Sequence, residues 1–216
     1  MADLRIVHMY PDLLRTYGDR GNVITLARRA EWRGLSVDVD AVSRGQALPK
    51  DCHIVFIGGG SDRVQAMIAG DLAPRRDELA ERIASGLVVL GVCGGYQLLG
   101  SYYRAVDGSM LAGLGLIDVR TEAGSRRIIG RVRGRFEDSG APMVGFENHA
   151  GRTFLGPSVS PLGRVKRGQG NNGKDRGEGA VSGSVFGTYL HGPVLPVNPA
   201  FADRLLDVAL RGKDAE

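Results

Sequence analysis

The stretch from Gly86 to Gly100, G-L-V-V-L-G-V-C-G-G-Y-Q-L-L-G, constrains the fold of this chain more than any other. Its first half is a run of β-branched and aliphatic residues that ends at Cys93 and has the length of one buried strand. Gly94 and Gly95 then permit a turn too sharp for residues with a Cβ atom, and Tyr96 begins apolar spacing that suits a helix. The stretch therefore predicts a strand-turn-helix corner with the cysteine at its apex.

A cysteine at such a corner is a candidate nucleophile. The corner projects its side chain over the carboxyl edge of a sheet, which is the geometry of a nucleophile elbow with a thiol in place of the serine hydroxyl. The free N–H groups and the dipole of the following helix favour the thiolate, so we expect Cys93 to ionise readily. The alternative is that Cys93 fills the core. The flanking glycines favour the catalytic role, because a packing residue does not need neighbours without side chains.

Length and composition are those of an ordinary globular protein. A chain of 216 residues can bury a full core and suits one domain, so we expect a single domain over residues 1–216. No apolar stretch approaches membrane-spanning length, and residues 1–7 enter a strand pattern without a secretory signal. These features predict a cytoplasmic protein without a transmembrane segment.

Charge and cysteine content limit the classes of ligand. The two cysteines, Cys52 and Cys93, fit a reducing compartment, and no Cys/His cluster has the spacing of a zinc site, so no metal is expected. The net charge is +4, and the arginines are spread along the chain rather than gathered with aromatic residues. This pattern favours a solvated surface first, an anionic partner second and nucleic acid last.

The first half of the chain alternates strand and helix patterns, with Asp19 as a helix N-cap. Strands are expected at 4–9, 35–42, 53–57 and 87–92, and helices at 19–33, at 74–85 and after Cys93. This order is typical of a doubly wound α/β fold, in which a mostly parallel central sheet carries helices on both faces. Sites in such folds lie beyond the carboxyl ends of the strands.

The second half has short strand patterns with no helices between them. They fall at 115–121, 127–136, 143–147, 162–166 and 184–190. They predict antiparallel β additions that extend the sheet or pack beside it. The polar, glycine-rich segment 168–179 is predicted to be a mobile loop, and Asn198 followed by Pro199 is expected to cap a closing helix that ends near residue 211.

A run of three glycines, Gly58 to Gly60, follows the strand at 53–57. The chain has neither G-x-G-x-x-G nor G-x-x-x-x-G-K-[ST], so nucleotide binding is weakly supported. The other interpretation is that backbone N–H groups at this strand end face Cys93 and form an oxyanion hole.

Thiol chemistry also needs a base within hydrogen-bond reach of the sulfur. Of the four histidines, His8 and His53 lie in strand patterns, which indicate core or edge positions. His149 lies in a turn-like context that could be near a site without supplying the base. His191 ends an apolar strand and is followed by a glycine and a proline, which stop the strand and expose the ring. It is the best candidate.

These motifs resemble a known enzyme family. G-V-C-G-G-Y-Q at 91–97 and G-T-Y-L-H-G at 187–192 resemble the class I glutamine amidotransferases, in particular their cobyric-acid-synthase-like (CobB/CobQ) branch. The I-G-G-G-S-D run from Ile57, F-E-N-H-A-G-R-T from Phe146 and G-N-N-G-K-D from Gly170 are similar to the GatD family, the glutaminase subunits of lipid II isoglutaminyl synthases. The resemblance covers nearly the whole chain and implies a flavodoxin-like α/β domain.

The resemblance also implies roles for individual residues. Cys93 would attack the side-chain amide of L-glutamine, and His191 would be its base. An arginine of the family holds the α-carboxylate of glutamine; Arg127 is at the matching position, and its neighbour Arg126 is the alternative. The resemblance implies that the backbone N–H groups of Gly60 and Gly94 hold the oxyanion. It also implies that the side chain of Gln97 lies beside the substrate.

A partner subunit is implied as well. Pro193 stands where many class I enzymes carry the acid that orients the histidine, so the resemblance implies that a partner supplies an aspartate. The chain has no recognisable ATP motif, so the ammonia must be used by another polypeptide. That partner would be a Mur-ligase-like (MurT-type) subunit in a heterodimer, which reaches lipid II at the membrane surface and amidates the D-glutamate α-carboxyl of its stem peptide.

No cofactor is expected in this chain, and ATP and Mg are expected on the partner. Three alternatives stay open. The chain could be a glutaminase for another amidation, such as cobyrinic or cobyric acid amide synthesis, a cysteine peptidase of related fold, or a non-catalytic regulatory module that binds a ligand at the sheet edge.

Overall fold

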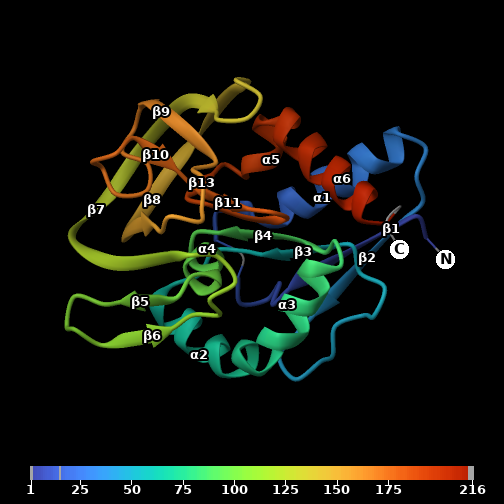
Figure 1. The fold of residues 1–216 in the computed structure, drawn as a ribbon, viewed down its shortest axis with the longest axis horizontal. Helices are drawn as coiled ribbons and strands as arrows, with labels where there is room; N and C mark the ends of the chain where they lie inside the picture. The colour runs from blue at the N-terminus through green and yellow to red at the C-terminus, as the bar shows by residue number, and fades with distance from the viewer. Residues whose placement is uncertain (1, 15, 214–216) are drawn as a thin grey trace.

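Two β-sheets lie side by side in the computed structural model, which describes residues 2–14 and 16–213 (Figure 1). The first sheet has the order β11-β12-β4-β3-β1-β2, and all its neighbours are parallel except β11 and β12. Its strands are β1 (Leu4–Met9), β2 (Val37–Val42), β3 (Ile54–Ile57), β4 (Val88–Val92), β11 (Ala180–Ser182) and β12 (Val185–Thr188). The predicted strands of the first half are confirmed, and β2 lies at the edge of the sheet.

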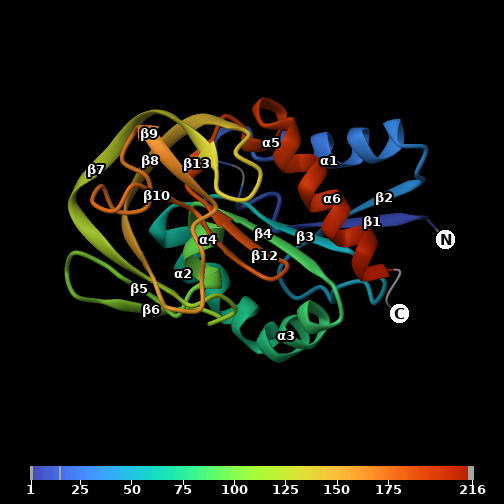
Figure 2. The ribbon, with the colours of Figure 1, turned by 45° about the horizontal axis from the view of Figure 1, so that its top comes forward.

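The helices are distributed over both faces of this sheet (Figure 2). They are α1 (Arg20–Trp32), α2 (Asp62–Leu72), α3 (Arg76–Ala84), α4 (Gly94–Leu99), α5 (Val194–Val197) and α6 (Pro199–Lys213), with 3₁₀ turns η1 (Thr16–Gly18) and η2 (Ala73–Arg75). Within the described part of the chain, none of these helices has the length and apolar character needed to cross a bilayer.

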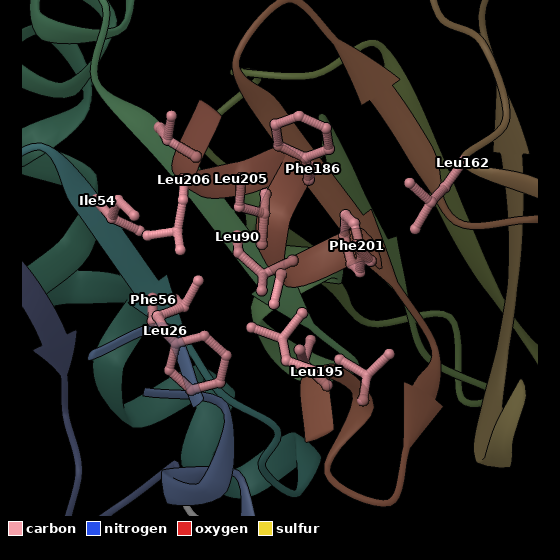
Figure 3. Close-up of a cluster of buried hydrophobic side chains, with 14 of the residues drawn as sticks. Leu26, Ile54, Phe56, Leu90, Leu162, Phe186, Leu195, Phe201, Leu205 and Leu206 are labelled. Carbon is pink, nitrogen blue, oxygen red and sulfur yellow. The ribbon is translucent and has the colours of Figure 1, made fainter. Parts of the chain in front are cut away.

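Alternation along the central strands divides the core between the two faces. Ile54 and Phe56 of β3 face α1 and α6, where they pack with residues such as Leu205 (Figure 3). Val55 and Ile57 point to the opposite face, which is covered by α2 and α3. Because both faces are buried, these strands are continuous apolar runs rather than alternating ones.

The second sheet is built around one long antiparallel pair. β7 (Val119–Phe136) and β8 (Pro142–Leu155) pair along most of their length, with an irregularity between Ala123 and Ile128. The remaining strands are β5 (Tyr102–Arg104), β6 (Met110–Ala112), β9 (Gly163–Arg167), β10 (Gly177–Glu178) and β13 (Leu190–His191). Most of the predicted antiparallel additions therefore form a sheet of their own. The strand predicted at 184–190 is an exception, because β12 joins the first sheet parallel to β4, and β11 pairs antiparallel to β12 at the edge of that sheet.

One apolar cluster joins the two sheets. Phe136 and Val165 of the second sheet belong to the same buried cluster as Leu90 and Phe201, and the Phe136 and Phe201 rings are 5.3 Å apart. We propose on this basis that residues 1–216 form one domain.

Several elements differ from the sequence prediction. Helix α2 and the short strands β5 and β6 were not predicted; α2 contains the exposed Gly70, a residue that weakens a helical pattern. The strands predicted at 115–121 and 127–136 are one strand, β7, which crosses the polar residues between them without a break. Its continuity comes from pairing with β8, which no local pattern reveals.

The glycine-rich segment 168–179 differs from the expected mobile loop. Asn171 and Asn172 are buried, and the Asn172 side chain donates to the Thr153 carbonyl at 3.0 Å. The Gly170 N–H donates to the Glu147 carboxylate at 2.9 Å. Residues 168–176 form a loop and Gly177–Glu178 form β10. The buried asparagines of the segment are hydrogen-bonded in the interior, whereas residues 173–176 are exposed.

Asn198 also has another role than the predicted helix cap. Its side-chain oxygen accepts from the Val144 N–H at 2.9 Å, and its amide donates to the Val144 and Val194 carbonyls at 2.7 Å. The side chain therefore ties β8 to α5. Pro199 begins α6 as predicted.

We expect the Gly95→Ala variant to be less stable than the wild type. A Cβ on Gly95 would overlap the Ile57 carbonyl of β3, while the Gly95 N–H donates to the Gly58 carbonyl at 3.1 Å, so the two backbones cannot separate freely. The expected loss in the free energy of unfolding is about 1–3 kcal/mol, measured by urea denaturation. Gly70→Ala is the matched control. Gly70 is an exposed helical residue with open space around it, so its replacement should gain about 0.5–1 kcal/mol. Equal effects would contradict the prediction.

Candidate active site

Cys93 lies at the apex of the predicted corner, between β4 and α4. Its backbone has φ 52° and ψ −103°, outside the regions that L-residues ordinarily occupy. Packing holds this strain in place: a Cβ on Gly91 would meet the backbone of Gly95, and one on Gly95 would meet the Ile57 carbonyl. Helix α4 therefore lies directly on strand backbone, and Cys93 is turned out of the sheet into a pocket.

The structure brings His191 to the same point from the other sheet. In β13, His191 pairs with Phe146 of β8. A Cβ built on Gly59 would lie 3.3 Å from His191 Cε1 and 3.4 Å from the Cβ of Cys93. Neither ring nitrogen of His191 has a hydrogen-bond partner among the described residues, and the Tyr17 ring packs against it edge-on at 4.7 Å. The predicted nucleophile and base are therefore neighbours.

The two predicted oxyanion donors are also adjacent. A Cβ on Gly94 would lie 3.0 Å from the amide nitrogen of Gly60. The turn from Gly58 to Gly60 is fixed to α4 by the hydrogen bond between the Gly95 N–H and the Gly58 carbonyl. Backbone N–H groups from two segments thus converge beside Cys93.

A pocket of about 510 Å³ opens in front of Cys93, within the size range of small-molecule sites. Four of the six predicted site residues line it: Gly60, Cys93, Gln97 and Arg127. Gly94 and His191 adjoin Cys93 outside the pocket wall. Other residues of the wall include Tyr17, Asp62, Arg63, Gln65, Tyr103, Asn148 and His149.

Arg127 rather than Arg126 faces the pocket. The Arg127 guanidinium donates to the side-chain oxygen of Asn148 at 3.0 Å and to its carbonyl at 3.1 Å. Asn148 in turn donates to the Tyr17 hydroxyl, so both neighbours hold the guanidinium at the pocket rim. Arg126 is not part of the wall, and its carbonyl accepts from Arg152 at 2.7 Å. The geometry therefore favours Arg127 as the carboxylate ligand.

Gln97 is held by a buried polar network. Its amide donates to the Tyr189 hydroxyl at 3.1 Å, which is 2.7 Å from the Thr153 hydroxyl. His149 stacks on Tyr189 with the ring centroids 3.7 Å apart, so its ring belongs to this network. Gln97 is therefore fixed at the inner end of the pocket.

Burial changes the acid–base properties of both reacting groups. Burial raises the pKa of the Cys93 thiol to about 12, the charge of Asp19 adds to the rise, and the Gly94 N–H and Arg127 oppose it. Burial also lowers the pKa of His191 to about 4. The expectation that the Cys93 thiol ionises readily is wrong for this chain alone. The loss of solvation raises its pKa by more than the N–H groups at the start of α4 lower it. At neutral pH the pair is a thiol and a neutral imidazole.

Asp19 belongs to the site and was missed by sequence reasoning. Its carboxylate accepts from the Gly59 N–H at 2.6 Å, it makes no cap hydrogen bond to α1, and burial raises its pKa to about 7. Asp19 thus supports the turn that carries the Gly60 N–H. The contact joins residues 40 positions apart, so the sequence contains no local signal for it.

Gln65 is a second missed residue. It lies on α2, its amide is 3.4 Å from the Gly60 carbonyl, and its buried side-chain oxygen has no hydrogen-bond partner in residues 2–14 and 16–213. It was missed because α2 was missed.

We expect the Asp19→Asn variant to gain stability over the wild type as pH rises. Asparagine keeps an oxygen for the Gly59 N–H but cannot ionise. In the wild type the folded pKa of about 7 lies above the ordinary 3.8, so the folded state retains a proton that the unfolded state loses between these values. The free energy of unfolding of the wild type therefore decreases as pH rises from about 4 to about 7, by about 1.4 kcal/mol for each unit of pKa shift. The variant has no such decrease, because its side chain does not ionise.

Urea denaturation across this pH range measures the difference between the two proteins. Asp203→Asn is the control of opposite sign: a hydrogen bond from Arg29 lowers the pKa of Asp203, so its replacement should cost stability at neutral pH and not at low pH. A pH-independent effect of Asp19→Asn would contradict the assignment.

Comparisons with known proteins agree with this geometry. The profile of the CobB/CobQ-like glutamine amidotransferase domain matches residues 5–199. The chain is 42% identical to the lipid II isoglutaminyl synthase (glutamine-hydrolyzing) subunit GatD of Streptococcus pneumoniae strain R6, over 97% of this chain and 82% of that protein. Identity to the Staphylococcus aureus strain N315 subunit of the same name is also 42%, over 99% of this chain and 87% of that protein.

Cobyric acid synthases also match, but this chain spans only 23% and 32% of the length of two of them. Among solved structures, PurLQS from Thermotoga maritima has a similar fold, with a TM-score of 0.67 at 18% identity, over 98% of this chain and 99% of that one. On the match to residues 5–199 and the identity to full-length relatives, the chain belongs to the CobB/CobQ-like glutamine amidotransferase family.

Proposed function

We propose that this chain is the glutaminase subunit of a lipid II isoglutaminyl synthase, and that it hydrolyses L-glutamine to L-glutamate and ammonia. The observation that carries the proposal is the convergence of Cys93, His191 and the Gly58–Gly60 turn beside a pocket of small-molecule size. The relatives that match almost the whole chain carry this activity in their names, which supports the same conclusion.

The first half of the reaction forms a thioester. The sulfur of Cys93 bonds to the side-chain carbonyl carbon of glutamine as the thiol proton passes to His191, and the carbonyl electrons move to oxygen. The N–H groups of Gly60 and Gly94 stabilise that oxyanion. When the carbonyl re-forms, the C–N bond breaks, and the His191 imidazolium protonates the leaving nitrogen, which departs as ammonia.

The second half releases glutamate. Neutral His191 takes a proton from water, whose oxygen bonds to the thioester carbonyl carbon. A second oxyanion forms in the same hole and collapses, the C–S bond breaks, and the proton returns to the Cys93 sulfur. Because the resting thiol and imidazole are both neutral, each proton transfer to His191 accompanies bond formation at carbon, and each transfer from His191 accompanies cleavage of a C–N or C–S bond.

The pocket offers opposite charges for the amino-acid end of glutamine. Arg127 supplies a guanidinium fork for the α-carboxylate. Acceptors for the α-ammonium are the carboxylate of Asp62, which also accepts from the Tyr103 hydroxyl at 3.1 Å, and the unpartnered side-chain oxygen of Gln65. This distribution of charge suits a free amino acid rather than a peptide.

The ammonia is used by a second polypeptide in this proposal. No carboxylate of the described residues bonds to the His191 ring, and Pro193 occupies the usual place of the third acid, which supports an acid from a partner. The partner is a Mur-ligase-like subunit that binds ATP and Mg and amidates the D-glutamate α-carboxyl of the lipid-linked stem peptide. The heterodimer works in the cytoplasm, at the membrane surface.

A glutaminase for corrinoid amide synthesis is the weaker alternative. Cobyric acid synthases are matched over a minor part of their own length, whereas the isoglutaminyl synthase subunits are matched over most of it.

The Cys93→Ala variant tests the division of labour between the subunits. In complex with the partner it should lose glutamine-dependent amidation of lipid II, because no thioester can form, and retain amidation from added ammonium. Cys52→Ala is the matched control, since Cys52 lies outside the pocket wall, and it should retain both activities. Loss of both activities in Cys93→Ala would count against the proposal. Mass spectrometry of the stem peptide measures both.

Arg127→Ala tests the carboxylate ligand. Loss of a charged hydrogen-bond fork should raise KM for glutamine between about tenfold and a hundredfold. Arg126→Ala removes the same charge one residue away and should change KM less than about twofold. Glutaminase kinetics of the complex measure both variants, and equal KM values for the two would refute the assignment.

A further inference from the structure

Six cations stand on the outer side of β7 and β9. Val132 and Phe136 of β7 point into the core, so the residues that alternate with them, Arg131, Arg133 and Arg135, point outward. All six cations are exposed; we call them the arginine face: Arg131, Arg133, Arg135, Arg164, Lys166 and Arg167. Figure 1 shows β7 and β9 at the end of the molecule away from the labelled chain ends.

The arginine face repels itself. Arg135 is directly opposite Arg164, and Arg133 is opposite Arg167. Like charges at such positions destabilise a sheet. Only Arg164 has a carboxylate partner, Glu137 at 3.2 Å; among the described residues no ion pair neutralises the others. The repulsion between these cations is therefore not compensated in the isolated chain, and contact with an anionic surface would reduce it.

The arginine face begins at the rim of the candidate active site. Along β7, Ile129 and Arg127 precede Arg131 on the same side, and Ile129 is 62% exposed. Across the ladder, Arg131 is opposite Phe146, whose ring meets the Tyr17 ring at 5.6 Å. Tyr17, which is 45% exposed, also packs on His191. One continuous surface thus joins the catalytic histidine to the cations.

We propose that this surface, with Ile129 and Tyr17 at the pocket end and the arginine face beyond them, is where an acidic surface of the amidating subunit docks. The proposal rests on the proposed function, because ammonia leaving the pocket must enter a protein that covers the rim. A protein seated on Ile129 and Tyr17 extends over the adjacent cations. Exposed apolar residues bordered by charge are typical of such interfaces, and charge complementarity sets their association rate and salt dependence.

The experiment compares two charge reversals of equal size. Arg131→Glu/Arg133→Glu changes the arginine face, and Arg44→Glu/Lys50→Glu changes two exposed cations in the connection between β2 and β3. Titration calorimetry measures Kd for the Mur-ligase-like subunit at low and at high sodium chloride. The first variant should weaken binding at least about tenfold at low salt and reduce its salt dependence, while the control stays within about twofold of the wild type.

Folding of both variants is checked by the presence of a cooperative thermal transition and by labelling of Cys93 with diazo-oxo-norleucine, a reaction that does not involve the changed residues. Wild-type affinity in the folded Arg131→Glu/Arg133→Glu variant overturns the proposal. The proposal is also overturned if this variant binds the subunit normally but no longer sediments with phosphatidylglycerol vesicles, because the arginine face would then bind lipid. If the wild type itself neither binds the subunit nor hydrolyses glutamine in its presence, the proposed function fails instead.

Discussion

The contact between the start of α4 and the carboxyl end of β3 is the constraint on which the site depends. Gly95 lies so close to the Ile57 carbonyl that no side chain fits between them, and this approach leaves Cys93 with a positive φ. The same approach brings the amides of Gly60 and Gly94 together. A helix held slightly farther from the sheet would relax the cysteine and separate the two donors. The strained backbone of Cys93 and the adjacent amides of Gly60 and Gly94 therefore both result from the close packing of α4 on β3.

Much of the first sheet could be predicted because its strands and turns are determined by short stretches of sequence. Apolar runs such as Ile54–Ile57 and Val88–Val92 mark strands buried on both faces, and glycines mark the turns that follow them. Placement of Cys93, Gly60 and Gly94 at one edge then follows from the parallel topology. Arg127 and Gln97 came from the family resemblance, and both line the pocket.

The remaining features depend on contacts between distant segments. His191 reaches the site because β13 pairs with β8, and Asp19 does so because its carboxylate meets the Gly59 N–H. The segment 168–179 has the composition of a solvated loop, yet Glu147 and Thr153 supply partners that bury its polar groups. Composition shows which polar groups of a segment require hydrogen-bond partners, and only the tertiary fold shows which residues supply them.

Burial also affects how the proposed base would be activated. Cys93 and His191 are shifted toward their neutral forms, which spares the isolated chain an uncompensated charge in its interior. The proposed mechanism creates an imidazolium at the same place. There Asp19 accepts from the Gly59 N–H instead, and no carboxylate of the described residues bonds to the His191 ring. A carboxylate brought by a partner would stabilise that cation and raise the pKa of His191. In the proposed complex, docking and activation of the base would then be the same physical event, and ammonia release would depend on the presence of the subunit that is proposed to consume it.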